Sequence, residues 1–142
     1  MSHSMTEAER HQFLAEGTRT AKVSTTRADG RPHVAPVWFA LDGDDLIFTT
    51  YKTTVKGRNL LRDPRVAICV DDERMPYAFA LIEGTATLSE DPSELLRWAT
   101  IIAGRYMGAD QAESFGQRNG VPGELLVRVT PTNLTAVSGV AD

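Results

Sequence analysis

Short segments in which apolar and polar residues alternate occupy most of the chain, and this alternation is typical of strands that bury one face. Asp-Gly pairs that start at Asp29 and Asp42 mark hairpin turns between the first three of these segments. Strands are predicted over residues 18–26, 33–41, 46–51, 65–71, 77–89 and 124–136. Gly84 interrupts the fifth strand and predicts a bulge or a close approach of two backbones.

Helices are predicted over residues 6–16, 54–61 and 91–107, and a short helix with a loop over residues 109–123. The first begins with Thr6 as its N-cap and Glu9 three positions later, and Gly17 ends it. The long one begins with Asp91 and Pro92, and its apolar residues recur at the spacing of one broad helix face.

The order of these elements favours a mainly β fold with helices, an antiparallel β-barrel, because most strands follow one another directly. A doubly wound α/β fold is disfavoured because no helices separate the first three strands. At 142 residues, the chain is expected to form a single domain over residues 6–142. Residues 1–5 are interpreted as a cloning remnant, an alternative start or a disordered beginning, and the tail from Ser138 is expected to fray.

Composition and charge exclude several classes of function. The net charge of −4 provides no global basic field for nucleic acid or an anionic membrane. One cysteine excludes an intrachain disulfide, and three scattered histidines form no metal site. No apolar run approaches the roughly 20 residues that span a bilayer, and the N-terminus lacks the build of a signal peptide. We therefore expect a cytoplasmic protein with a small-molecule substrate.

Residues 56–66, KGRNLLRDPRV, are the most informative stretch for chemistry. Backbone amides at the start of a helix and cationic side chains beside them suit a phosphate. A phosphate held beside a β-sheet suggests a phosphorylated cofactor. From these residues alone, a solvated basic helix face is the alternative. Arg62 and Arg65 are expected to pair with Asp63 or its neighbours.

Motifs over residues 27–38 (RADGRPHVAPVW), 56–60 (KGRNL), 63–66 (DPRV) and 82–86 (IEGTA) resemble those of one family. In this order they are similar to the pyridoxamine 5′-phosphate oxidase-like split β-barrel superfamily, and most of all to its flavin and deazaflavin oxidoreductases from actinobacteria. The resemblance covers residues 6–136. It implies a six-stranded antiparallel split β-barrel that forms a homodimer, with FMN or the deazaflavin coenzyme F420 at the dimer interface.

The resemblance also implies which residues bind the cofactor. Lys56 matches the family's phosphate-binding lysine, and Arg58 and Asn59 follow it at the start of the helix. The strand that lies along the cofactor ring contributes Val34, Pro36, Val37 and Trp38, and the end of the third strand contributes Thr49 and Thr50. Tyr77 matches an aromatic position that can reach the partner's cofactor. Core packing is the alternative for Trp38, and an ordinary interface position is the alternative for Tyr77.

Two departures separate the chain from pyridoxamine phosphate oxidases proper. Val55 precedes Lys56 where these enzymes carry arginine, and residues 133–137 stand in place of their C-terminal segment rich in Arg and Trp. The resemblance therefore favours F420, with FMN as the alternative. It implies an oxidoreductase in which reduced F420 passes a hydride to a small electron-poor substrate. No catalytic residue is assigned, and a non-catalytic carrier of F420, FMN or a tetrapyrrole is the rival function.

Overall fold

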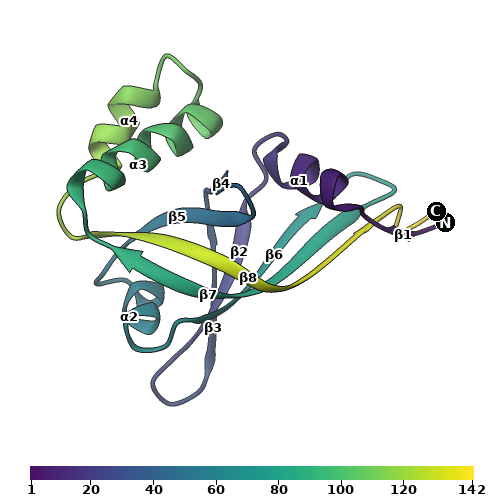
Figure 1. Ribbon diagram of the computed structural model, residues 1–142, viewed down its shortest axis with the longest axis horizontal. Helices are drawn as coiled ribbons and strands as arrows, with labels where there is room; N and C mark the ends of the chain where they lie inside the picture. The colour runs from purple at the N-terminus through teal and green to yellow at the C-terminus, as the bar shows by residue number, and fades with distance from the viewer.

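An antiparallel sheet of eight strands forms the centre of the computed structural model, which describes residues 1–142 (Figure 1). The strand order is β3-β2-β6-β7-β8-β5-β4, and β1 pairs with β8. The strands are β1 (His3–Ser4), β2 (Ala21–Thr26), β3 (Pro32–Val37), β4 (Ala40–Asp42), β5 (Asp45–Tyr51), β6 (Arg65–Asp72), β7 (Ala78–Ser89) and β8 (Glu124–Ser138). The helices are α1 (Glu7–Ala15), α2 (Val55–Arg62), α3 (Pro92–Met107) and α4 (Ala112–Asn119).

The sheet curls around one main core. Val37 of β3 and Leu46 of β5, from opposite ends of the strand order, belong to the same buried apolar cluster as Val23 and Val127. Each large side chain buried in this way stabilises the fold by about 1.5–3 kcal/mol. The prediction of an antiparallel β-barrel with helices is therefore confirmed, and β3 and β4 are the strands at its two free edges.

The predicted strand over residues 33–41 is wrong in one respect, because it divides into β3 and β4. The backbone of Phe39, between the two, bonds to side chains of α3 instead of to another strand. Its N–H donates to the hydroxyl of Tyr106 at 3.3 Å, and its carbonyl accepts from Arg105 at 2.8 Å. These bonds satisfy the buried backbone groups at the point where the strand breaks.

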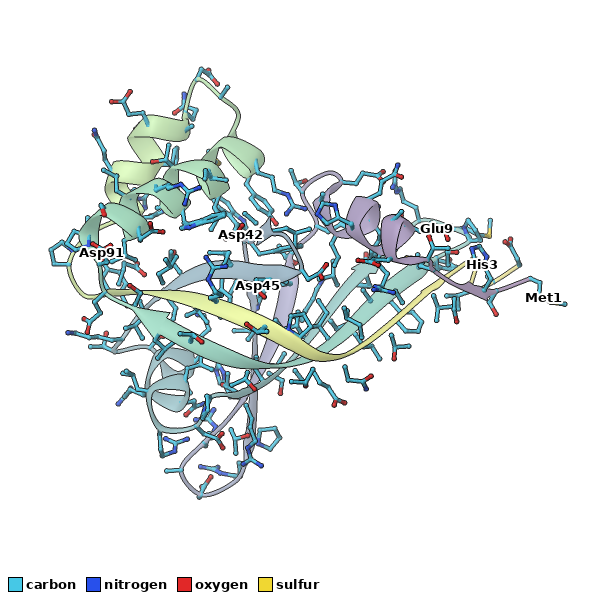
Figure 2. The ribbon with its side chains drawn as sticks, in the orientation of Figure 1. Met1, His3, Glu9, Asp42, Asp45 and Asp91 are labelled. Atoms are coloured by element: carbon cyan, nitrogen blue, oxygen red, sulfur yellow. The ribbon has the colours of Figure 1, made fainter.

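The beginning and the end of the chain are ordered, which differs from the expected disorder and fraying. His3 and Ser4 pair with the end of β8, and the side chain of Met5 lies in the core. Beyond β8, the amide of Val140 donates to the carbonyl of Tyr77 at 3.1 Å. The ring of His3 also lies 3.6 Å from the carboxylate of Glu9. Both residues are at the end of the molecule that carries the two termini (Figure 1, Figure 2).

The helices follow the capping signals in the sequence. Thr6 and Glu9 form the predicted capping box of α1, and Asp91 caps α3. The apolar face of α3 packs on β4, β5 and β8 through Leu95, Trp98 and Ile102. α4 packs against α3, so that the two helices form a hairpin at one corner of the sheet (Figure 1). None of the four helices combines the length and the apolar character that crossing a membrane requires.

Gly84 lies at the predicted irregularity, where the register between β7 and β8 shifts. A Cβ atom at this position would lie 2.6 Å from the carbonyl oxygen of Thr130. No real Cβ atom approaches a backbone oxygen so closely, so the two strands meet here only because the residue is glycine. The bulge bends β7 and helps the sheet to close around its core.

Candidate anion-binding site

The start of α2 is held tightly against the end of β5. The hydroxyl of Thr54 donates to the carbonyl of Tyr51 at 2.8 Å, accepts from the amide of Gly57 at 3.1 Å, and lies 2.9 Å from the hydroxyl of Thr50. A Cβ atom at Gly57 would lie 2.2 Å from the carbonyl oxygen of Tyr51, so glycine is required for this contact. The amide of Gly57 is therefore already satisfied by Thr54 and is not available to an anion.

Lys56 lies half-buried in the first turn of α2, and no carboxylate oxygen lies within 4.0 Å of its ammonium group. Burial lowers its pKa, because a charged ammonium is less stable away from water, and the nearby carboxylate of Glu124 partly opposes this. A half-buried cation without an ion-pair partner is suited to binding an anion from outside the chain.

Glu124 is the functional candidate that the sequence interpretation missed. It begins β8, it is only 7% exposed, and its Oε2 atom is buried without a hydrogen-bond partner. Burial raises the pKa of this carboxyl to about 7, and the positive charge of Lys56 acts in the opposite direction. The sequence does contain a signal for it, because Glu124 directly precedes the apolar run Leu125-Leu126-Val127. A carboxylate at the start of such a buried strand becomes buried with it.

A second cationic feature lies on the other side of α2, facing the turn between β2 and β3. We call it the arginine hollow: a depression of about 350 Å³ that is lined by Arg27, Arg31, Arg58 and Arg62, among others. Figure 1 shows α2 beside this hairpin. Lys56 is not among the lining residues, because side chains two positions apart leave a helix on different faces.

The arginines of the hollow differ in their partners. Arg31 pairs with Asp29 at 2.7 Å, and Arg62 donates to the backbone carbonyl of Thr26. Arg27 and Arg58 have no carboxylate within 4.0 Å. The expected pairing with Asp63 is confirmed for Arg65, at 2.8 Å, while Arg62 bonds elsewhere.

Asn59 has a structural contact where a cofactor contact was predicted. Its side chain is buried, and its Nδ2 atom donates to the hydroxyl of Thr25 at 3.0 Å. Its Oδ1 atom accepts from Arg62 at 3.3 Å. Both ends of the amide are therefore occupied, and the residue fixes α2 to β2. Thr50 is similarly buried and bonded to Thr54, whereas Thr49, its neighbour, is partly exposed.

The predicted ring-binding strand is β3, at one edge of the sheet. Val34 is 64% exposed and Pro36 is exposed, whereas the side chain of Val37 belongs to the core. β3 pairs only with β2, so its other edge is free for hydrogen bonds to a ligand or to another chain.

Trp38 is neither a core residue nor a free surface residue. It is 37% exposed, and its ring stacks on that of Tyr106 with centroids 5.0 Å apart and an angle of 1° between the planes. Tyr106 is itself fixed, since its hydroxyl donates to the carbonyl of Arg19 at 2.7 Å. The pair forms a rigid aromatic surface beside the end of β3.

Tyr77 lies far from α2 within one chain. It precedes β7 at the end of the molecule that carries the termini, whereas α2 lies near the opposite end of the sheet (Figure 1). Its φ of 68° is unusual for a residue with a side chain, and the side chain is 44% exposed. A single chain therefore does not bring Tyr77 and Lys56 together.

Another hollow, of about 440 Å³, lies on the outer face of β2, β6 and β7. Its lining is largely polar and includes Ser24, Thr26, Glu83 and Thr85. The one cation in it, Arg65, is already paired with Asp63. It therefore lacks the unpaired positive charge that distinguishes the surroundings of Lys56.

Comparison with known proteins agrees with this fold. A family model described as pyridoxamine 5′-phosphate oxidase matches residues 7–138. Among solved structures, the conserved hypothetical protein Rv2991 from Mycobacterium tuberculosis is 27% identical, with 93% of this chain and 84% of that chain covered and a TM-score of 0.81.

Two further solved structures are informative. A protein named F420 reductase is 29% identical, with 87% of this chain and 94% of that chain covered and a TM-score of 0.68. HutZ, a haem storage protein from Vibrio cholerae, is 22% identical, with 90% of this chain and 92% of that chain covered and a TM-score of 0.69. At that lower identity the likeness to HutZ concerns the fold alone.

Proposed function

Because the chain belongs to the pyridoxamine 5′-phosphate oxidase family, we propose that it is an oxidoreductase that uses the deazaflavin F420, bound between two copies of the chain. The observation that carries this proposal is Lys56, a half-buried cation at the start of α2 with no acidic partner within 4.0 Å. Such a group fits a phosphate, which F420 and FMN both contain.

Each part of the site has a task in this proposal. Lys56 binds the phosphate as a point charge. The free edge of β3 and the aromatic surface of Trp38 lie along the ring system, with Val34 and Pro36 exposed beside it. A ligand with further acidic groups finds Arg27 and Arg58 unpaired in the arginine hollow. When bound, reduced F420 supplies a hydride to a small electron-poor substrate.

Two observations favour F420 over FMN. The F420 reductase is 29% identical over most of both chains, and Val55 stands before Lys56 in place of the arginine of pyridoxamine phosphate oxidases. FMN has the same phosphate and a similar ring, so it is the alternative ligand of the same site. Pyridoxamine phosphate oxidation itself is disfavoured by the same difference at Val55.

A homodimer is part of the proposal. Tyr77 is remote from Lys56 in its own chain, so it reaches a cofactor only if that cofactor is held by a second copy. The unpaired edge of β3 and the exposed side chains of Val34 and Leu81 supply surface for such a contact. Size-exclusion chromatography with light scattering measures the mass directly and is expected to give twice that of the chain.

Titration of the purified protein with F420, FMN and haem, each followed by fluorescence or absorbance, tests the ligand. We expect micromolar or tighter binding of F420 and weaker binding of FMN. Reduced F420 is then mixed with quinones as electron-poor acceptors, and its oxidation is followed. Binding without turnover identifies a carrier, preferential binding of haem identifies a tetrapyrrole carrier, and binding of none contradicts the cofactor assignment.

A further inference from the structure

Glu124 is a buried acid with an unusual environment. Its Oε2 atom is inaccessible to solvent and has no hydrogen-bond donor, although the side chain stands at the start of a strand close to solvent-exposed turns. An ionised carboxylate without a donor is costly in such a place, and most buried polar groups avoid it. The unsatisfied oxygen therefore calls for an explanation that the packing of β8 does not supply.

The backbone brings Glu124 close to Lys56. Glu124 is the register partner of Tyr51 at the end of β5, and the adjacent amide of Lys52 donates to the carbonyl of Gly123 at 2.9 Å. On its other side, Tyr51 receives the first turn of α2 through the tight contact with Gly57. Lys56 and Glu124 thus flank the same residue and interact electrostatically, but their charged atoms are more than 4.0 Å apart.

Other charged groups nearby are already engaged. The ammonium of Lys52 pairs with Glu90 at 3.2 Å, and the phenol of Tyr51 lies in an exposed side chain beside Gly123. The positive charge of Lys56 lowers the pKa of Glu124, and the negative charge of Glu124 raises the pKa of Lys56, each against a larger and opposite effect of burial. The two charged groups therefore influence each other's pKa without forming an ion pair.

We propose that Glu124 sets the affinity of the Lys56 site for phosphate. When the carboxyl of Glu124 is ionised, it competes with the phosphate for the positive charge of Lys56, and when the carboxyl is protonated, Lys56 is free to bind the phosphate. This inference rests on the proposed function for the identity of the ligand, but not for the coupling between the two side chains. A phosphate that binds Lys56 favours protonated Glu124, so binding and protonation are linked.

The direction of the pH effect follows from this linkage. Burial raises the pKa of Glu124 to about 7, so the carboxyl changes its charge near neutral pH. Below this pH the carboxyl is neutral and Lys56 is free to bind an anion. Above it, the bound state must either take up a proton or place two negative groups together, so affinity falls as pH rises.

The binding test compares the wild type with Glu124→Gln, which keeps the shape of the side chain and removes its charge. FMN and F420 dissociation constants are measured between pH 6 and pH 8.5. Ionisation of the phosphate itself affects both proteins equally. Beyond that shared effect, we expect wild-type affinity to fall roughly tenfold over this range and the affinity of Glu124→Gln to stay constant. Glu90→Gln, at an exposed carboxylate nearby, is the matched control and should behave like the wild type.

A second measurement separates this inference from the proposed function. The carboxyl of Glu124 is titrated by ¹³C NMR in the ligand-free protein, with and without inorganic phosphate, and in Lys56→Met. We expect a raised pKa that rises further in the variant and in the presence of phosphate. An ordinary pKa of Glu124, or a raised one that responds neither to phosphate nor to Lys56→Met, overturns the inference. An equal pH dependence of ligand binding in wild type and Glu124→Gln overturns it as well. If neither cofactor binds, the proposed function fails and the response to inorganic phosphate decides the inference alone.

Discussion

Two of the charged clusters in this small barrel use similar side chains in opposite ways. At the corner where α1, α3 and β6 meet, Arg105 donates to the carbonyls of Leu14, Gly17 and Phe39 at 2.8 to 3.0 Å. Asp72 there accepts from Arg19 and from Arg74. We call this the paired corner.

The Lys56 site differs from the paired corner in what is left unsatisfied. Lys56 has no ion-pair partner, and one oxygen of Glu124 is buried without a donor. In the paired corner, the charged side chains are satisfied by hydrogen bonds, and these bonds stabilise the packing of helices on the sheet. The comparison indicates that the paired corner is structural, and that the Lys56 site retains bonding capacity for a ligand.

Removing Arg105 should produce the largest loss of stability. Arg105→Ala leaves three backbone carbonyls without their charged donor and removes the contact of the guanidinium with the ring of Phe39. We expect the free energy of unfolding to fall by about 3 kcal/mol. Urea denaturation measures it, and a change below about 1 kcal/mol would show that the corner is not a structural anchor.

Glu124→Gln should increase the free energy of unfolding, in contrast to Arg105→Ala. Burial raises the pKa of the Glu124 carboxyl to about 7 in the folded chain, whereas unfolding returns it to its ordinary value of 4.5. Between these values the folded chain holds a proton that the unfolded chain has lost, so wild-type stability falls as pH rises. The variant lacks this loss and should be more stable than the wild type by about 3 kcal/mol at pH 8 and equally stable near pH 4. Urea denaturation at both pH values checks this, and an equal difference at both would contradict it.

Tyr106→Phe is a smaller change at the paired corner, where the hydroxyl of Tyr106 donates to the carbonyl of Arg19. The variant keeps the ring that stacks on Trp38 and removes the hydroxyl that bonds to the backbone of Arg19 and Phe39. We expect a loss of about 1 kcal/mol in the free energy of unfolding. Thermal unfolding with near-ultraviolet circular dichroism follows both the loss of stability and the environment of Trp38, whose signal should stay as in the wild type.

Arg65→Ala should have the smallest effect. Its partner Asp63 is two residues away in an exposed turn, and such pairs contribute little in water. Neither the unfolding midpoint nor the affinity for FMN or F420 should change measurably. A marked loss of affinity would place Arg65 and the hollow on β2, β6 and β7 in the ligand site, and Lys56 would no longer be distinguished from the paired cations.

Much of the fold could be predicted because its signals are local. The alternation along β2, β5, β6, β7 and β8, the capping box of Thr6 and Glu9, and the bulge at Gly84 all depend on residues near one another in sequence. The break after Val37 could not be predicted in this way, since it depends on Arg105 and Tyr106, which lie more than 60 positions away in the chain.

The candidate site was predictable only in part, for the same reason. The position of Lys56 at a helix start follows from the residues around it and from the family resemblance. That Asn59 bonds to Thr25, or that Lys56 affects the pKa of Glu124, depends on how β2, α2 and β8 come together. Contacts of this kind have no periodic pattern in the sequence.

The most direct test of the contrast is the affinity of Lys56→Ala for F420 and FMN at pH 6.5, with Lys52→Ala as the matched control. Lys52 is a neighbouring lysine that already pairs with Glu90 at 3.2 Å. The account predicts at least a roughly tenfold loss of affinity in Lys56→Ala, wild-type affinity in Lys52→Ala, and unchanged stability in both. Equal affinities in the two variants would contradict the claim that the unpaired lysine at the start of α2 is the phosphate anchor.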